Sequence, residues 1–193
     1  MVGKELPRRH VDADELKALA HPLRQRILYH LAFAGPATST TIAAAFGEST
    51  GSASYHLRQL ERFGFVEEDA ERSRGRDRWW RLVPLDLRGI ADDAVADADT
   101  RAAGERLSRM RLERDRDLVD RYLANRHRFG DWEDAATFSS SAAHLTPGEL
   151  GEFVEEYVAL LRRYWRAPED RPEDAIPVAM LFYAFPWPGE RPA

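Results

Sequence analysis

Short hydroxyl side chains and arginines are concentrated between residues 38 and 81 of this 193-residue chain. Hydroxyl groups stand at the start of two helical patterns, at 38–40 and at 49–54, and the second pattern continues with Tyr55 and Arg58. Five arginines then follow between Arg72 and Arg81. These residue types donate hydrogen bonds to phosphate oxygens and to base edges. The concentration of both in one segment indicates contact with a nucleic-acid duplex.

The second helical pattern, which begins near Thr50, is the candidate for reading bases. If it enters a major groove, its first turns face base edges, and Gly51 lets the backbone approach closely. An arginine such as Arg58 paired with guanine is worth roughly 1–3 kcal/mol. The hydroxyls at 38–40 suit a phosphate at a helix N-terminus, and the later arginines suit a phosphate backbone or a minor groove. The predicted DNA-contacting residues are Thr38, Ser39, Thr40, Thr50, Gly51, Ser52, Ser54, Tyr55, Arg58, Arg72, Arg74, Arg76 and Arg78.

Each of these features also has a purely structural interpretation. The hydroxyl run could serve only as a helix N-cap. The arginines could form a solvated hairpin tip, paired with Glu71 and Asp77. For His56, a structural role is favoured over a base contact, and for Trp79 and Trp80 we favour strand packing over base stacking. The spacing of the helices around these residues favours DNA contact for the set as a whole.

Local signals predict the elements that position these residues. Two helices are expected within residues 12–34, and a short helix ends at Gly47. The next helix has an inward stripe at Ala53, Leu57 and Leu60, followed by Gly64 at the usual glycine position after a helix end. Two short helices with a tight connection predict a helix-turn-helix. Strands at 65–70 and 77–82, joined by the charged tip ERSRGRD, add a β-hairpin and complete a winged helix.

The second half of the chain is expected to be mostly helical. A pattern from Leu87 to about Arg126 predicts a long helix, with a kink or break near Gly104 left open. We expect it to form a dimer interface, alone or together with the first helix of the chain. A capping-box pattern at 146–149 opens an amphipathic helix, and residues 176–185 read as a buried strand. The aromatic residues of this half are expected to form core, with an effector pocket or a partner surface as alternatives; they include Trp132, Phe138, Tyr157, Tyr164, Trp165 and Phe182.

Together these elements predict a mainly α fold with a small β component. We expect a winged helix-turn-helix domain at 1–83. A helical dimerisation region and a small α+β part, with effector binding left open, follow at 84–193. Net charge divides along the same line. Residues 1–83 hold 13 Lys and Arg against 11 Asp and Glu, whereas residues 84–193 hold 15 against 22, and the whole chain carries −5. The predicted DNA-binding half is therefore mildly basic and the remainder acidic.

Several classes of function lack support in the sequence. The chain has no cysteine, which removes disulfides and thiolate metal sites. It has no HExxH pair, no phosphate-binding glycine loop and no nucleophile elbow, so we predict no catalytic residues, no metal and no cofactor. No signal peptide and no bilayer-spanning apolar stretch is evident, and we expect a cytoplasmic protein without membrane contact.

Two stretches carry a resemblance to a known family. LKALAHPLRQRILYHL, followed by TSTTIAAAFGESTGSASYHLRQLERFGFVEE and an Arg-rich wing, resembles the ArsR-type winged-helix transcriptional repressors over about Asp14 to Val83. The second half is similar to the tail of a longer subset of such regulators. The resemblance implies a homodimer that binds a palindromic operator in double-stranded DNA. It does not imply metal sensing, because residues 40–46 lack the cysteine-bearing motif of the metal-sensing members.

The sequence therefore predicts a dimeric DNA-binding transcriptional regulator. Repression is what the family resemblance implies, and binding of a small-molecule effector is left open. The alternative is a winged helix that serves as a protein–protein interaction module without sequence-specific DNA binding. In that interpretation the acidic second half would bind a basic partner.

Overall fold

The computed structural model describes residues 11–73, 75, 77–84, 97–166 and 170–189. The chain divides into two compact units, of which the first runs to Leu118 and the second begins at Val119. This division falls inside a long helix. The boundary that the sequence predicts between residues 83 and 84 stays a prediction.

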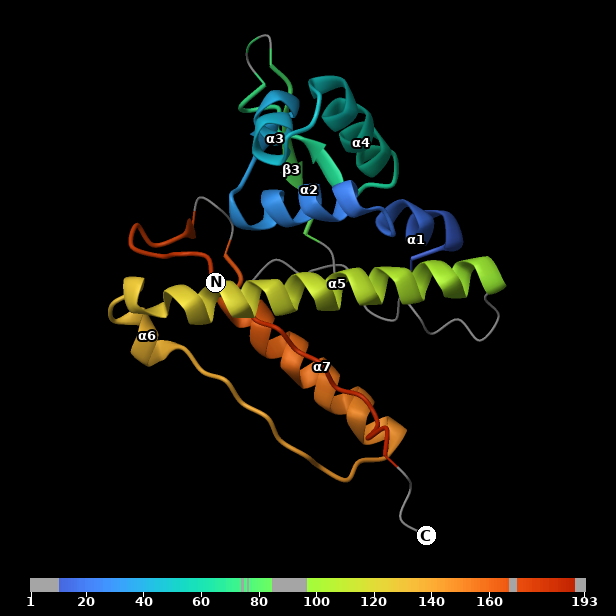
Figure 1. The fold of residues 1–193 in the computed structure, drawn as a ribbon, viewed down its shortest axis with the longest axis vertical. Coiled ribbons are helices and arrows are strands. Elements are labelled where there is room, and N and C mark those ends of the chain that lie inside the picture. The colour runs from blue at the N-terminus through green and yellow to red at the C-terminus, as the bar shows by residue number, and fades with distance from the viewer. Residues whose placement is uncertain (1–10, 74, 76, 85–96, 167–169, 190–193) are drawn as a thin grey trace. The chain divides into compact units, whose positions relative to one another are not determined.

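The first unit begins with four helices: α1 (Ala13–Leu19), α2 (Pro22–Phe33), α3 (Ser39–Phe46) and α4 (Thr50–Arg62) (Figure 1). Their starts follow local capping chemistry. The Asp12 carboxylate accepts from the backbone N–H of Glu15 at 2.8 Å, and Glu15 accepts from the backbone of Asp12, which forms a capping box. Pro22 occupies the first position of α2, where a missing N–H costs nothing.

The end of α4 is fixed by a left-handed glycine. Gly64 has φ of 66°, and its backbone N–H donates to the Glu61 carbonyl at 2.8 Å. The next residue, Phe65, donates its N–H to the Leu60 carbonyl at 2.9 Å and is buried. These two bonds form a Schellman motif, which satisfies carbonyls that the helix end would leave open. The helix therefore stops at a defined residue and directs the chain into the next strand.

A small antiparallel sheet completes the first unit. Its strands are β1 (Ala37–Thr38), β2 (Val66–Glu68) and β3 (Trp79–Leu82), in the order β1-β3-β2. The register pairs Ala37 with Trp80 and Val66 with Leu82. The predicted hairpin of β2 and β3 is confirmed, with strands shorter than expected, and the two-residue β1 is an addition that the sequence did not indicate. This is the arrangement of a winged helix-turn-helix, as the sequence predicts.

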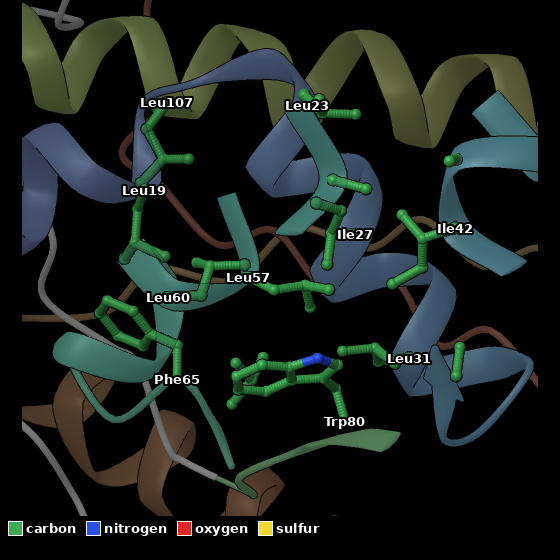
Figure 2. Packing of buried hydrophobic residues seen from close by; sticks show 14 of the residues in the cluster. Leu19, Leu23, Ile27, Leu31, Ile42, Leu57, Leu60, Phe65, Trp80 and Leu107 are labelled. Carbon is green, nitrogen blue, oxygen red and sulfur yellow. The ribbon is translucent and has the colours of Figure 1, made fainter. Parts of the chain in front are cut away.

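The core of the first unit lies between these helices and the sheet. Figure 2 shows Leu57 and Leu60 of α4 facing Ile27 of α2, with the indole of Trp80 below them. Trp80 is buried, which confirms that it packs as part of the strand. The cluster also includes Ala103 and Leu107 of α5 (Ala98–Asn125). The start of the long helix thus belongs to the same core as the helix-turn-helix.

The long helix predicted from Leu87 to Arg126 is present as α5, which runs without a break through Gly104. Its predicted first part, 87–96, lies outside the described residues. A 3-10 turn at Arg126–Arg128 and the short α6 (Trp132–Ala135) follow, and the capping box at Thr146 opens α7 (Pro147–Tyr164) as predicted. None of the described helices combines the length and apolar character that crossing a bilayer requires.

The buried strand predicted at 176–185 is wrong. These residues form no strand, and Val178, Met180 and Phe185 are exposed. A strand needs a neighbour that accepts its backbone hydrogen bonds, and no described segment pairs with this one. The expectation of a second aromatic core is also wrong, because none of its six residues is buried. An apolar run indicates that burial of the segment would be favourable. It does not show that another part of the same chain covers the segment.

Replacing Trp80 with alanine should remove the largest ring from the core. We expect the free energy of unfolding to fall by about 3–5 kcal/mol, the usual cost of an aromatic-to-alanine change in a packed interior. Trp187→Ala is the matched control, since that ring is 83% exposed, and it should leave stability nearly unchanged. Urea denaturation followed by circular dichroism measures both, and equal midpoints for the two variants would contradict this core.

Candidate nucleic-acid interface

Helix α4 has one buried face and one open face. Ala53, His56, Leu57 and Leu60 are buried against the rest of the unit. On the opposite side, Gly51, Tyr55, Arg58 and Arg62 are all exposed and lie at steps of three and four residues, which place them on a single stripe. Tyr55 is 56% exposed. The predicted base-reading residues Tyr55 and Arg58 therefore project away from the core.

Hydroxyl groups surround the start of α4. Ser49 is the N-cap and accepts from the Ser52 backbone N–H at 3.0 Å, while the Ser52 hydroxyl contacts the Glu48 carboxylate at 3.2 Å. Thr50 is exposed and Ser54 is half-buried. The capping interpretation thus holds for Ser49, which was outside the predicted contact set, and Thr50 keeps an open surface for contact.

Gly51 leaves open space at the first turn of α4. A Cβ built at this position would meet only Ser49 Oγ, at 3.9 Å, which is ordinary van der Waals contact. The backbone conformation does not require glycine here, since φ is not positive. What the glycine provides is an exposed helix surface without a side chain, where another molecule can approach the backbone.

The three hydroxyl residues at the start of α3 differ in accessibility. Thr38 is buried, its Oγ1 accepts from the Thr41 backbone N–H at 3.1 Å, and it lies 3.0 Å from the Thr41 hydroxyl. This side chain is occupied as the N-cap of α3. Ser39 is half-buried and Thr40 is exposed. Of the predicted phosphate contacts in this segment, Thr40 has the most accessible hydroxyl.

The described part of the wing uses its arginines in ion pairs. The Arg78 guanidinium contacts the Glu68 carboxylate at 2.5 Å and the Glu61 carboxylate at 2.8 Å, and lies over the Trp80 ring, 4.4 Å from its centroid. Glu61 belongs to α4, so Arg78 connects the wing to that helix. Arg72 pairs with Asp69 at 3.3 Å. Arg78 thus pairs with residues of β2 and α4, and Arg72 with a residue just after β2. Pairing of Glu71 and Asp77 with Arg74 and Arg76 stays a prediction, because these two arginines lie outside the described residues.

Sequence reasoning missed the basic continuation of the α4 stripe. Arg62 follows Arg58 by four residues and lines an open pocket of about 340 Å³ together with Lys17 of α1 and Arg24 of α2. Asp14 and Gln59 also line it. The helical spacing from Arg58 would have indicated Arg62, whereas the approach of Lys17 and Arg24 depends on how α1 and α2 pack. The open face of α4 thus extends into a surface rich in cations.

Two histidine rings lie close together, at a tilt, on the buried side of α4. The ring of His56 lies 4.4 Å from that of His21, the N-cap residue of α2, measured between centroids. Each Nδ1 is buried without a hydrogen-bond partner among the described residues. Burial lowers the pKa of both rings, the positive charge of Arg24 lowers both further, and the Glu48 carboxylate opposes the shift. His56 is therefore structural, as the sequence favours, and both rings are held neutral near pH 7.

Comparison with known proteins agrees with this geometry. A protein family described as "Helix-turn-helix domain" matches residues 19–69, which span α2, α3, α4 and β2. The chain therefore contains a helix-turn-helix domain. No curated protein matches its sequence.

Two solved structures share some likeness with the chain. The transcriptional regulator Tm0710 from Thermotoga maritima is 11% identical, with 77% of this chain and 80% of that chain covered and a TM-score of 0.31. MepR, a transcription regulator of the Staphylococcus aureus multidrug efflux pump MepA, is 16% identical, with 77% and 78% covered and a TM-score of 0.28. At this distance neither structure identifies the function of the chain.

The histidine pair should make stability depend on pH. The unfolded chain protonates these rings near their ordinary pKa of 6.5, whereas the folded chain protonates them at lower pH. Below 6.5 the unfolded state binds more protons, so stability should fall as pH drops from 7.5 towards 5.5. Thermal unfolding of the native chain and of His56→Gln across this range measures the effect. The variant should show a shallower slope and the exposed His127→Gln an unchanged one; equal slopes for all three would refute the role of the pair.

Proposed function

We propose that this chain is a dimeric DNA-binding transcriptional regulator of the ArsR type, which acts in the cytoplasm as a repressor on a palindromic operator. The observation that carries the proposal is the open face of α4, where Gly51, Tyr55 and Arg58 are exposed directly opposite the buried stripe. The helix-turn-helix match and the resemblance of residues 14–83 support the same assignment.

In this proposal α4 lies in the major groove. Arg58 has no ion-pair partner within the described part of the chain, so its guanidinium is free to make a bidentate contact with guanine. The exposed hydroxyls of Thr40 and Thr50 contact phosphates, and Arg72, Arg74 and Arg76 contact the backbone or the minor groove. Arg78, held by Glu61 and Glu68, sets the position of the wing relative to α4.

Two copies would pair through α5. Leu112 and Leu123 of this helix are 57% and 47% exposed, although exposure of a leucine side chain to water is unfavourable. A two-fold dimer places the recognition helices about one DNA turn apart, roughly 34 Å, and a palindromic operator has the same symmetry. Bound across a promoter, such a dimer would exclude the transcription machinery.

The alternative function is a protein-interaction module, and the acidic charge of residues 84–193 favours it. A mobility-shift assay with the promoter region of the protein's own gene, at low and high salt, separates the two. A discrete complex that persists against unrelated duplex supports the regulator. A chain that binds no duplex at low salt supports the module instead.

Arg58→Ala should weaken specific binding. We expect a loss of about 1–3 kcal/mol, or about five- to 150-fold in affinity, for a duplex recovered by genomic footprinting with the purified chain. Binding to unrelated duplex should change far less. Arg128→Ala removes the same charge from an exposed position outside the helix-turn-helix and serves as the control. Equal affinities for the native chain and Arg58→Ala would count against α4 as the reading helix.

The double variant Arg74→Ala, Arg76→Ala should weaken binding to all duplexes alike. Each arginine that neutralises a phosphate releases a counterion, so the slope of log affinity against log salt should become shallower by about 2. Fluorescence anisotropy at a series of salt concentrations measures this slope. An unchanged slope would show that the wing tip does not contact the phosphate backbone.

A further inference from the structure

Cations from three helices meet at one open pocket. Lys17 of α1, Arg24 of α2 and Arg62 of α4 line this pocket, whose volume is about 340 Å³. Among the described residues that line it, Asp14 is the one that bears a carboxylate. Positive side chains therefore outnumber negative ones, and such an excess favours an anionic occupant. We call it the cationic pocket.

Arg24 is fixed at the cationic pocket by the end of α1. Its Nε donates to the Ala18 carbonyl, and its Nη2 donates to the Lys17 carbonyl at 3.1 Å. These carbonyls lie in the last turn of α1, where a positive charge is favourable. Burial lowers the pKa of Arg24, and nearby Tyr55 opposes this shift. The guanidinium is thus a partly desolvated charge in a fixed position, which an anion would stabilise.

The carboxylates of the chain leave most of this positive charge available. Within the described ranges, no carboxylate forms an ion pair with Arg24 or Arg62. Lys17 has a carboxylate nearby, that of Asp97. Hydrogen bonds from Thr100 lower the pKa of Asp97, and the positive charge of Lys17 lowers it further. An anion in the pocket would therefore meet Arg62 as the least engaged of the three cations.

The cationic pocket adjoins the face of α4 that is proposed to read bases. Arg62 lies on the exposed stripe of α4, four residues after Arg58 and seven after Tyr55. With a rise of about 1.5 Å per residue, Arg62 is roughly 6 Å farther along the helix than Arg58 and about 10 Å farther than Tyr55. Phosphates border the major groove, which is about 12 Å wide. A helix that contacts bases through Tyr55 and Arg58 thus brings Arg62 towards the phosphates at the groove edge.

We propose that the cationic pocket binds a phosphate group of the DNA backbone, beside the base pairs that α4 contacts. The Arg62 guanidinium donates to the phosphate oxygens, while Arg24 and Lys17 add positive charge from the two neighbouring helices. The place of Arg62 on the base-reading stripe favours a backbone phosphate over a free anion. The inference rests on the proposed function and deepens it, because it extends the DNA contact to Lys17 of α1, which precedes the matched residues 19–69.

Removal of the two exposed cations tests the contact in the full chain. We expect Lys17→Ala, Arg62→Ala to weaken binding about tenfold at about 0.1 M salt, and to make the slope of log affinity against log salt shallower by about 1, the value for one phosphate. Preference for the duplex recovered by footprinting over unrelated duplex should not change, because phosphates carry no sequence information. The control Arg128→Ala, Arg163→Ala removes the same charge from exposed positions outside the first unit and should leave the slope unchanged. A native slope in the Lys17→Ala, Arg62→Ala variant would overturn the proposal.

Ethylation of single phosphates, which removes their charge, locates the contact on the same duplex. Ethylation of a phosphate that borders the contacted base pairs should interfere with binding of the native chain, and should no longer interfere with binding of the Lys17→Ala, Arg62→Ala variant. Circular dichroism establishes that each variant keeps the native fold, as expected for exposed side chains. An identical interference pattern for both proteins would overturn this inference and leave the proposed function intact. A native chain that binds no duplex would overturn both.

Discussion

The open face of α4 depends on the burial of its other face. Ala53, Leu57 and Leu60 are fully buried against the remaining core, and this fixes the rotation of the helix about its axis. The Ser49 cap and the Schellman motif at Gly64 fix its two ends. Because a rotation of 100° separates neighbouring residues, a change in this packing would turn Tyr55 and Arg58 away from the open face. The packing of the buried face of α4 thus also determines which residues lie on its open face.

Charged residues around α4 divide into those that hold the structure and those that remain available. Arg78 is committed to Glu61, Glu68 and the Trp80 ring, and so joins the wing to the helix. Arg24 is committed to the carbonyls of Lys17 and Ala18. Arg58 and Arg62 lie on the exposed stripe of α4. Residue type alone does not distinguish these groups, since the difference lies in whether a carboxylate or carbonyl from another element reaches the guanidinium.

The sequence predicted features that local chemistry controls, and missed those that depend on distant partners. Caps at Thr38 and Thr146 and the stop at Gly64 each depend on a few neighbouring residues, and all three appear in the structure. Strand β1 is two residues long and exists because β3, which is distant in the sequence, pairs with it, so no local pattern indicates it. The error at 176–185 has the same cause, since an apolar run does not show whether a second strand will meet it. The ion pairs of Arg78 with Glu61 and Glu68 likewise required three-dimensional contacts.

The entry of α5 into the first core has a practical consequence. Ala103 and Leu107 are almost completely buried in the cluster that supports α4. A shortened protein that stopped at the end of β3 would lack Ala103 and Leu107. Leu19 and its neighbours would then form an apolar patch exposed to solvent. Such a fragment would tend to precipitate, whereas a fragment extended past Leu107 would keep the residues that cover this core. The helix-turn-helix and α5, the helix proposed to join two copies, therefore share one core. A gene fusion or domain shuffling event that separated them would disrupt this core.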